Sequence, residues 1–168
     1  MKYLLLVSLI FLLGFSSCLG PEYDKPYLYE SAYTPILMQR EDLEKSIKLD
    51  GPRAIKDFGK IYIKDSLLFI NEKYEGIHVV DNSDPSNPEN LAFIVIPGSI
   101  DISILNDVIY ADNAVDLVAF RYNGSDITLL DRNRNVFPEL VPPQGEQYYF
   151  NYNINRPENT VIVKWVLK

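Results

Sequence analysis

Cys18 is the residue whose chemistry the sequence defines most clearly. It is the only cysteine in the 168-residue chain, and it follows two small residues, Ser16 and Ser17. A lone cysteine excludes a disulfide within the chain, so the thiol is available for another reaction. Because it comes directly after an apolar stretch from Leu4 to Phe15, the expected reaction is attachment of lipid.

The residues before Cys18 have the three parts of a secretion signal. Lys2 is the positive charge, the apolar stretch is shorter than the roughly 20 residues that span a bilayer, and small residues mark a cleavage site. Phe15-Ser16-Ser17-Cys18 resembles a bacterial lipobox, with phenylalanine where the motif usually has leucine. We predict a lipoprotein signal peptide over 1–17 and a membrane anchor at acylated Cys18. The alternative is an ordinary secretory signal with an incidental cysteine.

The remaining reactive side chains form no catalytic motif. His78 is the only histidine and lies between Ile77 and Val79, where a surface or cross-strand role is more typical than that of a general base. The sequence has no zinc spacing, phosphate loop, dinucleotide fingerprint or nucleophile motif. We therefore predict no enzymatic activity, no cofactor and no metal. The 23 acidic residues leave one alternative, an acidic-site hydrolase acting on a surface glycan, because carboxylate separation cannot be read from sequence.

Two loops are rich in acids. The first runs from Asp81 to Pro88, and the second contains Asp112, Asn113 and Asp116. Short polar side chains can accept nearby backbone N–H groups, and proline fixes φ, so both loops suit tight turns. The first loop lacks the alternating oxygen ligands and the glycine of a calcium loop. We predict turns here, with calcium as the alternative.

The charge balance predicts no nucleic-acid partner. The chain has 16 basic and 23 acidic residues, a formal charge of −7, and removal of residues 1–17 would take away one lysine and no acid. Its densest basic segment is Arg132-Asn133-Arg134. Binding to phosphates requires clustered lysine and arginine, which this chain lacks.

One aromatic cluster is a candidate recognition surface. Tyr148, Tyr149 and Tyr152 lie within five residues of one another, together with an amide. Such aromatic rings can stack on sugars or grip extended peptides, which leaves both a protein and a glycan ligand open. The alternative is ordinary packing in a half-buried strand.

The elements that would position these residues are almost all strands. Residues 18–39 alternate proline with tyrosine and are expected to form an extended tether, and residues 40–47 are expected to form a short helix or a charged loop. After residue 54, runs rich in Ile, Val, Tyr and Phe alternate with turn residues, which predicts an antiparallel all-β domain. The expected strands are 60–64, 67–71, 77–81, 91–96, 100–105, 108–112, 117–122, 127–131, 147–153 and 160–167.

A weak internal repeat organises these strands. Asp65-Ser66 and Asn106-Asp107 each suit a two-residue hairpin turn. A shift of 41 residues aligns 65–71 with 106–112, and after a one-residue gap 76–81 aligns with 116–121. A period near 40 with four strands per unit is typical of a β-propeller blade. Chance alignment of two generic hairpins is the alternative.

The first unit is similar to the LVIVD repeat of bacterial surface and periplasmic β-propellers. The similarity is carried by Ile61-Tyr62-Ile63, by 67–70, by Gly76-Ile77-His78-Val79-Val80-Asp81 and by Asp84-Pro85-Ser86-Asn87-Pro88. It extends over about 59–98. The second unit, about 100–138, matches in its first three strands and lacks the Asp-Pro pair. The resemblance implies a propeller-like fold in the cell envelope, and it transfers no catalytic residue.

We therefore expect one β-propeller-like repeat domain over 40–168. It would contain units at 59–98 and 100–138 and C-terminal strands at 147–168, which amounts to two to two and a half blades. Propellers close with four to eight blades. The sequence leaves three solutions open, namely further C-terminal blades, association with a copy or partner, or a small sandwich. The expected function is a non-enzymatic scaffold or binding module, lipid-anchored in the bacterial cell envelope at the outer membrane, facing the periplasm or the surface.

Overall fold

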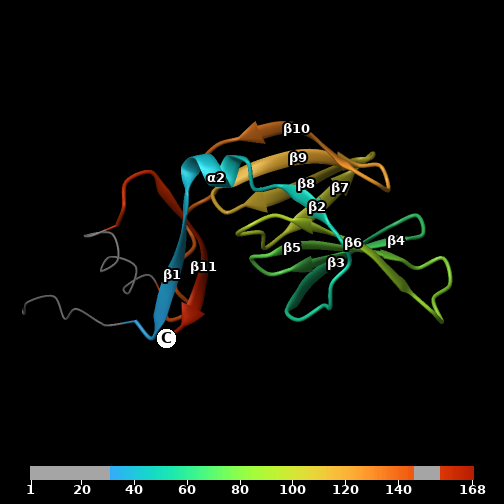
Figure 1. Ribbon diagram of the computed structural model, residues 1–168, viewed down its shortest axis with the longest axis horizontal. Coiled ribbons are helices and arrows are strands. Elements are labelled where there is room, and N and C mark those ends of the chain that lie inside the picture. Colours follow the sequence, from blue (N-terminus) through green and yellow to red (C-terminus); the bar gives the residue numbers. More distant parts are fainter. Residues whose placement is uncertain (1–30, 146–155) are drawn as a thin grey trace, which may run out of the picture.

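The computed structural model describes residues 31–145 and 156–168 of the protein (Figure 1). One turn of helix, α2, is accompanied only by strands, and all strand pairs are antiparallel, so the predicted all-β class is confirmed. The elements are β1 (Tyr33–Gln39), α2 (Arg40–Glu44), β2 (Lys48–Asp50), β3 (Phe58–Lys64), β4 (Leu67–Glu72), β5 (Gly76–Asp81), β6 (Glu89–Val95), β7 (Ile102–Leu105), β8 (Val108–Asn113), β9 (Asp116–Tyr122), β10 (Ile127–Asn133) and β11 (Thr160–Leu167).

The described strands form two sheets and a two-stranded ribbon. Sheet 1 has the order β2-β6-β5-β4-β3, and sheet 2 has the order β10-β9-β8-β7. Apart from β2, each sheet is a meander in which neighbours in sequence are neighbours in space. The terminal ribbon pairs β1 with β11 and stands across the left-hand ends of both sheets in Figure 1. Contacts with both sheets hold it there: Lys164 reaches Glu75 at 2.6 Å, and Val161 and Val163 pack with Val115.

The two meanders turn at corresponding places. The predicted hairpin turns at Asp65-Ser66 and Asn106-Asp107 are present, and Asp65 and Asn106 have φ of 54° and 49°. The next turns again use the left-handed region, at Tyr74 with φ of 65° and Ala114 with φ of 58°. The four turns recur at the offsets of 41 and 40 residues at which the sequence aligns with itself.

The main core lies between the two sheets. Side chains alternate across each strand, so each sheet has an inner face toward the other sheet and an outer face away from it. Sheet 1 contributes Phe69, Ile77, Val79, Ala92, Ile94 and Ile96 to the core, and sheet 2 contributes Ile102, Ile104, Ile109, Ala111, Val118 and Phe120. Val79, Phe120 and Ile94 are among the side chains with no exposed surface.

β3 and β7, the first strands of the two meanders, are joined by polar contacts. The hydroxyl of Tyr62 donates to the carbonyl oxygen of Ile104 at 2.9 Å. Lys60 and Lys64, on the same face of β3, bind Asp101 at 2.5 Å and Asp107 at 2.7 Å. The inward side of β3 is thus held against β7 along most of its length.

The structure differs from the sequence-based expectation near the N-terminus. Of the tether predicted over 18–39, residues 33–39 instead form β1, because β11 offers a pairing edge and Pro35 fits opposite Trp165 next to a register shift. The helix predicted over 40–47 is one turn long and ends at Glu44, after which the backbone turns. The signal peptide at 1–17, the first part of the tether and the strand predicted over 147–153 lie outside the described residues.

Candidate binding pocket

A hollow of about 570 Å³ lies on the outer face of sheet 2. Its floor is formed by β7 and β8, and one wall by the segment 137–141, which follows β10. The lining is mainly aliphatic and aromatic, with few polar groups. Its residues are Tyr74, Ile100, Asp101, Ile102, Ser103, Tyr110, Ala111, Asp112, Ala114, Leu117, Phe137, Pro138, Glu139, Leu140 and Val141.

Long-range contacts hold the wall segment beside the sheet. The N–H of Phe137 donates to the carbonyl of Val115 at 3.0 Å, and the indole N–H of Trp165 on β11 donates to the carbonyl of Leu140 at 2.9 Å. Trp165 itself is nearly buried. The terminal ribbon therefore fixes the wall of the pocket, because one of its strands carries the donor.

The carboxylates at the pocket are already engaged. Asp112 accepts the backbone N–H groups of Ile100 and Asp101 at 2.8 to 2.9 Å. Burial raises the pKa of Asp112, with a contribution from the Asp101 carboxylate, although these N–H bonds act to lower it. Glu139 forms a two-point ion pair with Arg156 at 2.6 and 2.7 Å. Both acids thus hold backbone and side chains in place, which suits a site that binds an apolar group.

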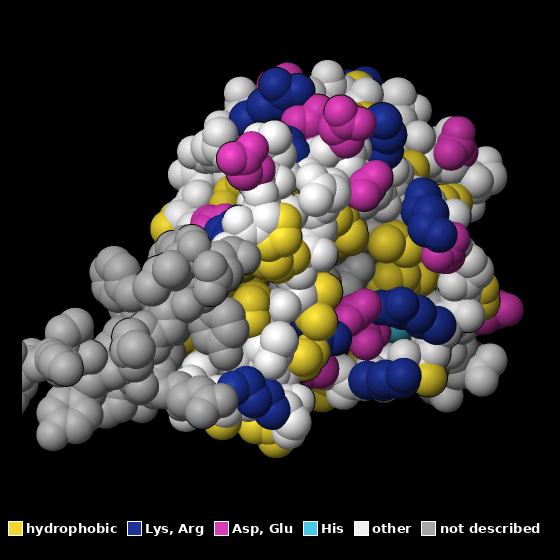
Figure 2. Space-filling model, turned by 60° about the vertical axis from the view of Figure 1, so that its left-hand side comes forward, with side chains coloured by type: hydrophobic (Ala, Val, Ile, Leu, Met, Phe, Trp, Pro, Cys, Tyr) yellow, Lys and Arg dark blue, Asp and Glu magenta, His cyan; other side chains and the backbone are white. Residues whose placement is uncertain are grey.

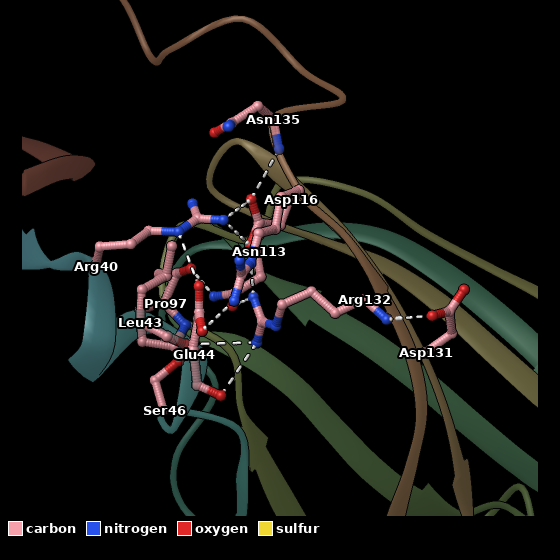
Figure 3. Close-up of polar contacts among 11 residues, drawn as sticks. Arg40, Leu43, Glu44, Ser46, Pro97, Asn113, Asp116, Asp131, Arg132 and Asn135 are labelled. Carbon is pink, nitrogen blue, oxygen red and sulfur yellow. Dashed lines mark hydrogen bonds and ion pairs between the residues drawn. The ribbon is translucent and has the colours of Figure 1, made fainter. Parts of the chain in front are cut away.

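A second cluster of charges centres on Asp116, at the turn between β8 and β9 (Figure 3). Its buried carboxylate accepts two bonds from Arg40 at 2.8 and 2.9 Å, one from Arg132 at 2.7 Å and one from the N–H of Asn135 at 3.0 Å. Arg132 also donates to the side-chain oxygen of Asn113 at 2.8 Å. Burial would raise the pKa of Asp116, but the Asn135 N–H and the two guanidinium groups outweigh burial, so its pKa lies below the usual value.

This cluster fixes α2 on the end of sheet 2. Arg40 belongs to α2 and also pairs with Glu44 one turn later at 3.1 Å, while Arg134 binds the other side of Glu44 at 2.8 Å. Every oxygen of the Asp116 carboxylate has a partner within the protein. The cluster is therefore best explained as a clamp that joins α2, β9 and the loop after β10.

Sequence reasoning missed one buried pair in sheet 1. His78 was expected at the surface or in a cross-strand contact, and the structure shows it without exposed surface, its Nε2 at 2.5 Å from Oε2 of Glu72. Its ring packs edge-on against Phe93 at 4.7 Å, and Nδ1 has no hydrogen-bond partner among the described residues. Arg53 lies 3.7 Å from Glu72 and covers the Phe93 ring at 3.4 Å. This packing leaves no approach for a substrate to the His78 ring.

The first acidic loop forms turns, as predicted. Asp81 and Asp84 accept the N–H groups of Ser83 and Ser86 at 2.8 and 2.9 Å. In the second loop Asp112 and Asp116 instead make the contacts described above. No group of three or more potential metal ligands occurs within 31–145 and 156–168.

The residues predicted to carry function lie beyond the described ranges. This applies to Cys18, the lipid attachment site, and to Tyr148, Tyr149 and Tyr152, the candidate recognition surface. Within the part of the chain that the structure describes, no helix is long and apolar enough to cross a membrane.

Charges of both signs are mixed on the face drawn in Figure 2, where lysine and arginine side chains lie next to acidic ones. Comparison with models of known protein families, with curated proteins and with solved structures finds no match to this chain. The case for function therefore rests on the residues and geometry of the chain itself.

Proposed function

We propose that the protein is a non-enzymatic binding module, anchored by lipid on Cys18 in the bacterial cell envelope, at the outer membrane. In this proposal the binding surface is the outer face of sheet 2. The observation that carries the proposal is the apolar hollow of about 570 Å³ on that face. Ligand sites are typically concave and mostly apolar, and large apolar surfaces are uncommon on proteins without partners.

We further propose that the two meanders are consecutive units of the LVIVD type, which are blades of a partial β-propeller. Three observations support this proposal. The meanders have the same strand order, their turns adopt left-handed backbone at matching offsets, and their first strands, β3 and β7, lie side by side. A propeller is built from such four-stranded units arranged around a common axis.

The proposed ligand is an apolar surface of a protein. A sugar offers many hydroxyl groups that need polar partners, whereas this pocket is mainly lined by groups such as Leu117, Phe137 and Val141. Its two engaged acids, Asp112 and Glu139, are held by backbone N–H groups and by Arg156. A glycan hydrolase needs one carboxyl group to give up a proton and a second to act as base or nucleophile. We therefore favour binding over hydrolysis.

Photo-crosslinking in the full-length, membrane-bound protein tests this function. A benzophenone amino acid replaces Leu105, which is 63 % exposed on the outer face of sheet 2, and in a matched control it replaces Lys48 at the far edge of sheet 1. We expect protein adducts from position 105 only, and their loss when Leu117→Arg fills the pocket. Equal labelling at both positions, or no adduct from position 105, would contradict the proposal.

A further inference from the structure

The inner face of sheet 1 and the outer face of sheet 2 are built from equivalent positions. With the 41-residue offset before the second turn and 40 after it, each inward residue of sheet 1 corresponds to an outward residue of sheet 2. The inward residues Tyr62, Phe69, Asn71, Ile77 and Val79 thus correspond to Ser103, Tyr110, Asp112, Leu117 and Ala119.

The converse holds for the other two faces. Outward residues of sheet 1 correspond to the residues with which sheet 2 packs against sheet 1. Ile61, Ile63, Leu68, Ile70 and Val80 correspond to Ile102, Ile104, Ile109, Ala111 and Phe120. The sheets are therefore stacked in the same sense, like successive members of a row. Their contact is head-to-tail, and one unpaired half of that contact is left at each end.

Apolar side chains are exposed at both ends of this row. On sheet 1, β3 presents Phe58, Ile61 and Ile63, which are 64 %, 54 % and 68 % exposed. On sheet 2, Leu105 is 63 % exposed, and the apolar pocket opens on the same face. The loop before β3 covers a different part of the sheet 1 face, where Arg53 lies over Phe93.

We propose that a second copy of this chain occupies the outer face of sheet 2. The β3 strip of that copy, which consists of Phe58, Ile61 and Ile63, docks beside Leu105 and the pocket of the first. The argument is continuity with the internal interface, since Ile61 and Ile63 hold the positions at which Ile102 and Ile104 already pack against sheet 1. This inference rests on the proposed function and specifies the partner of its binding surface.

A head-to-tail contact of this kind uses two different patches. Such heterologous contacts extend into rings or chains, whereas a twofold dimer pairs one patch with itself. Substitution in one patch must therefore be rescued by a copy that is substituted in the other. This complementation separates the two geometries.

The test uses the full lipidated chain in detergent, studied by light scattering and sedimentation over a range of concentrations. The variants are Ile63→Lys and Leu105→Lys, with Leu167→Lys as a matched control at a leucine that is 68 % exposed on β11. We expect wild type and control to self-associate, each face variant alone to do so at least about tenfold more weakly, and an equimolar mixture of the two to form a 1:1 dimer. Unchanged thermal unfolding of the variants shows that they are folded.

Several outcomes would overturn the inference. A wild type that stays monomeric does so, as does Leu105→Lys that self-associates like wild type, or a mixture that remains monomeric. Crosslinks from position 105 to other proteins only, with a monomeric wild type, would overturn this inference and leave the proposed function standing. Absence of any crosslink from position 105 would remove the proposed function itself.

Discussion

The phenol of Tyr62 and the carbonyl of Ile104 join the two sheets through a hydrogen bond of 2.9 Å. The neighbouring ion pair of Lys60 with Asp101 is well exposed, and exposed ion pairs contribute about 0 to 1 kcal/mol. The Tyr62 bond, together with apolar packing, therefore carries more of the contact between β3 and β7. It also sets the outward direction of the alternate residues on β3.

Tyr62→Phe should lower the free energy of unfolding by about 1 kcal/mol, because the variant keeps the ring and loses the bond to Ile104. Urea unfolding measures the difference. Tyr122→Phe is the matched control, since the Tyr122 hydroxyl donates only to the nearby carbonyl of Gly124 at 2.9 Å. Equal losses in the two variants would show that the contact between sheets contributes nothing beyond a local hydrogen bond.

Cys18→Ala should release the protein from the membrane and leave the precursor uncleaved by the lipoprotein peptidase, because alanine has no thiol to acylate. Membrane fractionation with palmitate labelling measures both effects. Ser17→Ala keeps a small residue before the cleavage site and should be labelled like wild type. A Cys18→Ala protein that still takes up palmitate would contradict lipid attachment at this residue.

The strands of the two meanders could be predicted because their signals are local. Alternating apolar residues and the turn residues Asp65 and Asn106 lie within each hairpin, and β4 to β10 were expected within a few residues of their observed bounds. β1 and β2 were missed because their pairing is long-range. The partner of β1 is β11, and proline at position 35 suggested a tether rather than a strand.

The candidate pocket could not be predicted for the same reason. Its wall is held by Trp165, which lies 25 residues from its acceptor Leu140, and no local pattern indicates that contact. The Glu72–His78 pair did leave a signal. A hairpin register that places Asn71 opposite Ile77 also puts Glu72 and His78 on one face, which predicts their contact.

Asp116 shows how the second meander departs from the first. It corresponds to Gly76, which carries no side chain, so the cluster of Arg40, Arg132 and Asp116 belongs to sheet 2 alone. Asp116 has no exposed surface, and the Arg132 side chain is 10 % exposed. Removal of one member of a buried ion pair leaves the others without compensation, which is more costly than loss of a surface pair.

Asp116→Asn should therefore destabilise the protein by about 3 to 5 kcal/mol near neutral pH, as measured by urea unfolding. The folded-state pKa of Asp116 lies below its usual value of 3.8, so the carboxylate contributes fully above that value and its contribution is lost as pH falls through the folded pKa. The difference between wild type and variant should thus shrink below about pH 4. Glu89→Gln, at an exposed acid, should match wild type throughout. A variant as stable as wild type at neutral pH, or a difference that persists in acid, would show that Asp116 does not act as a clamp.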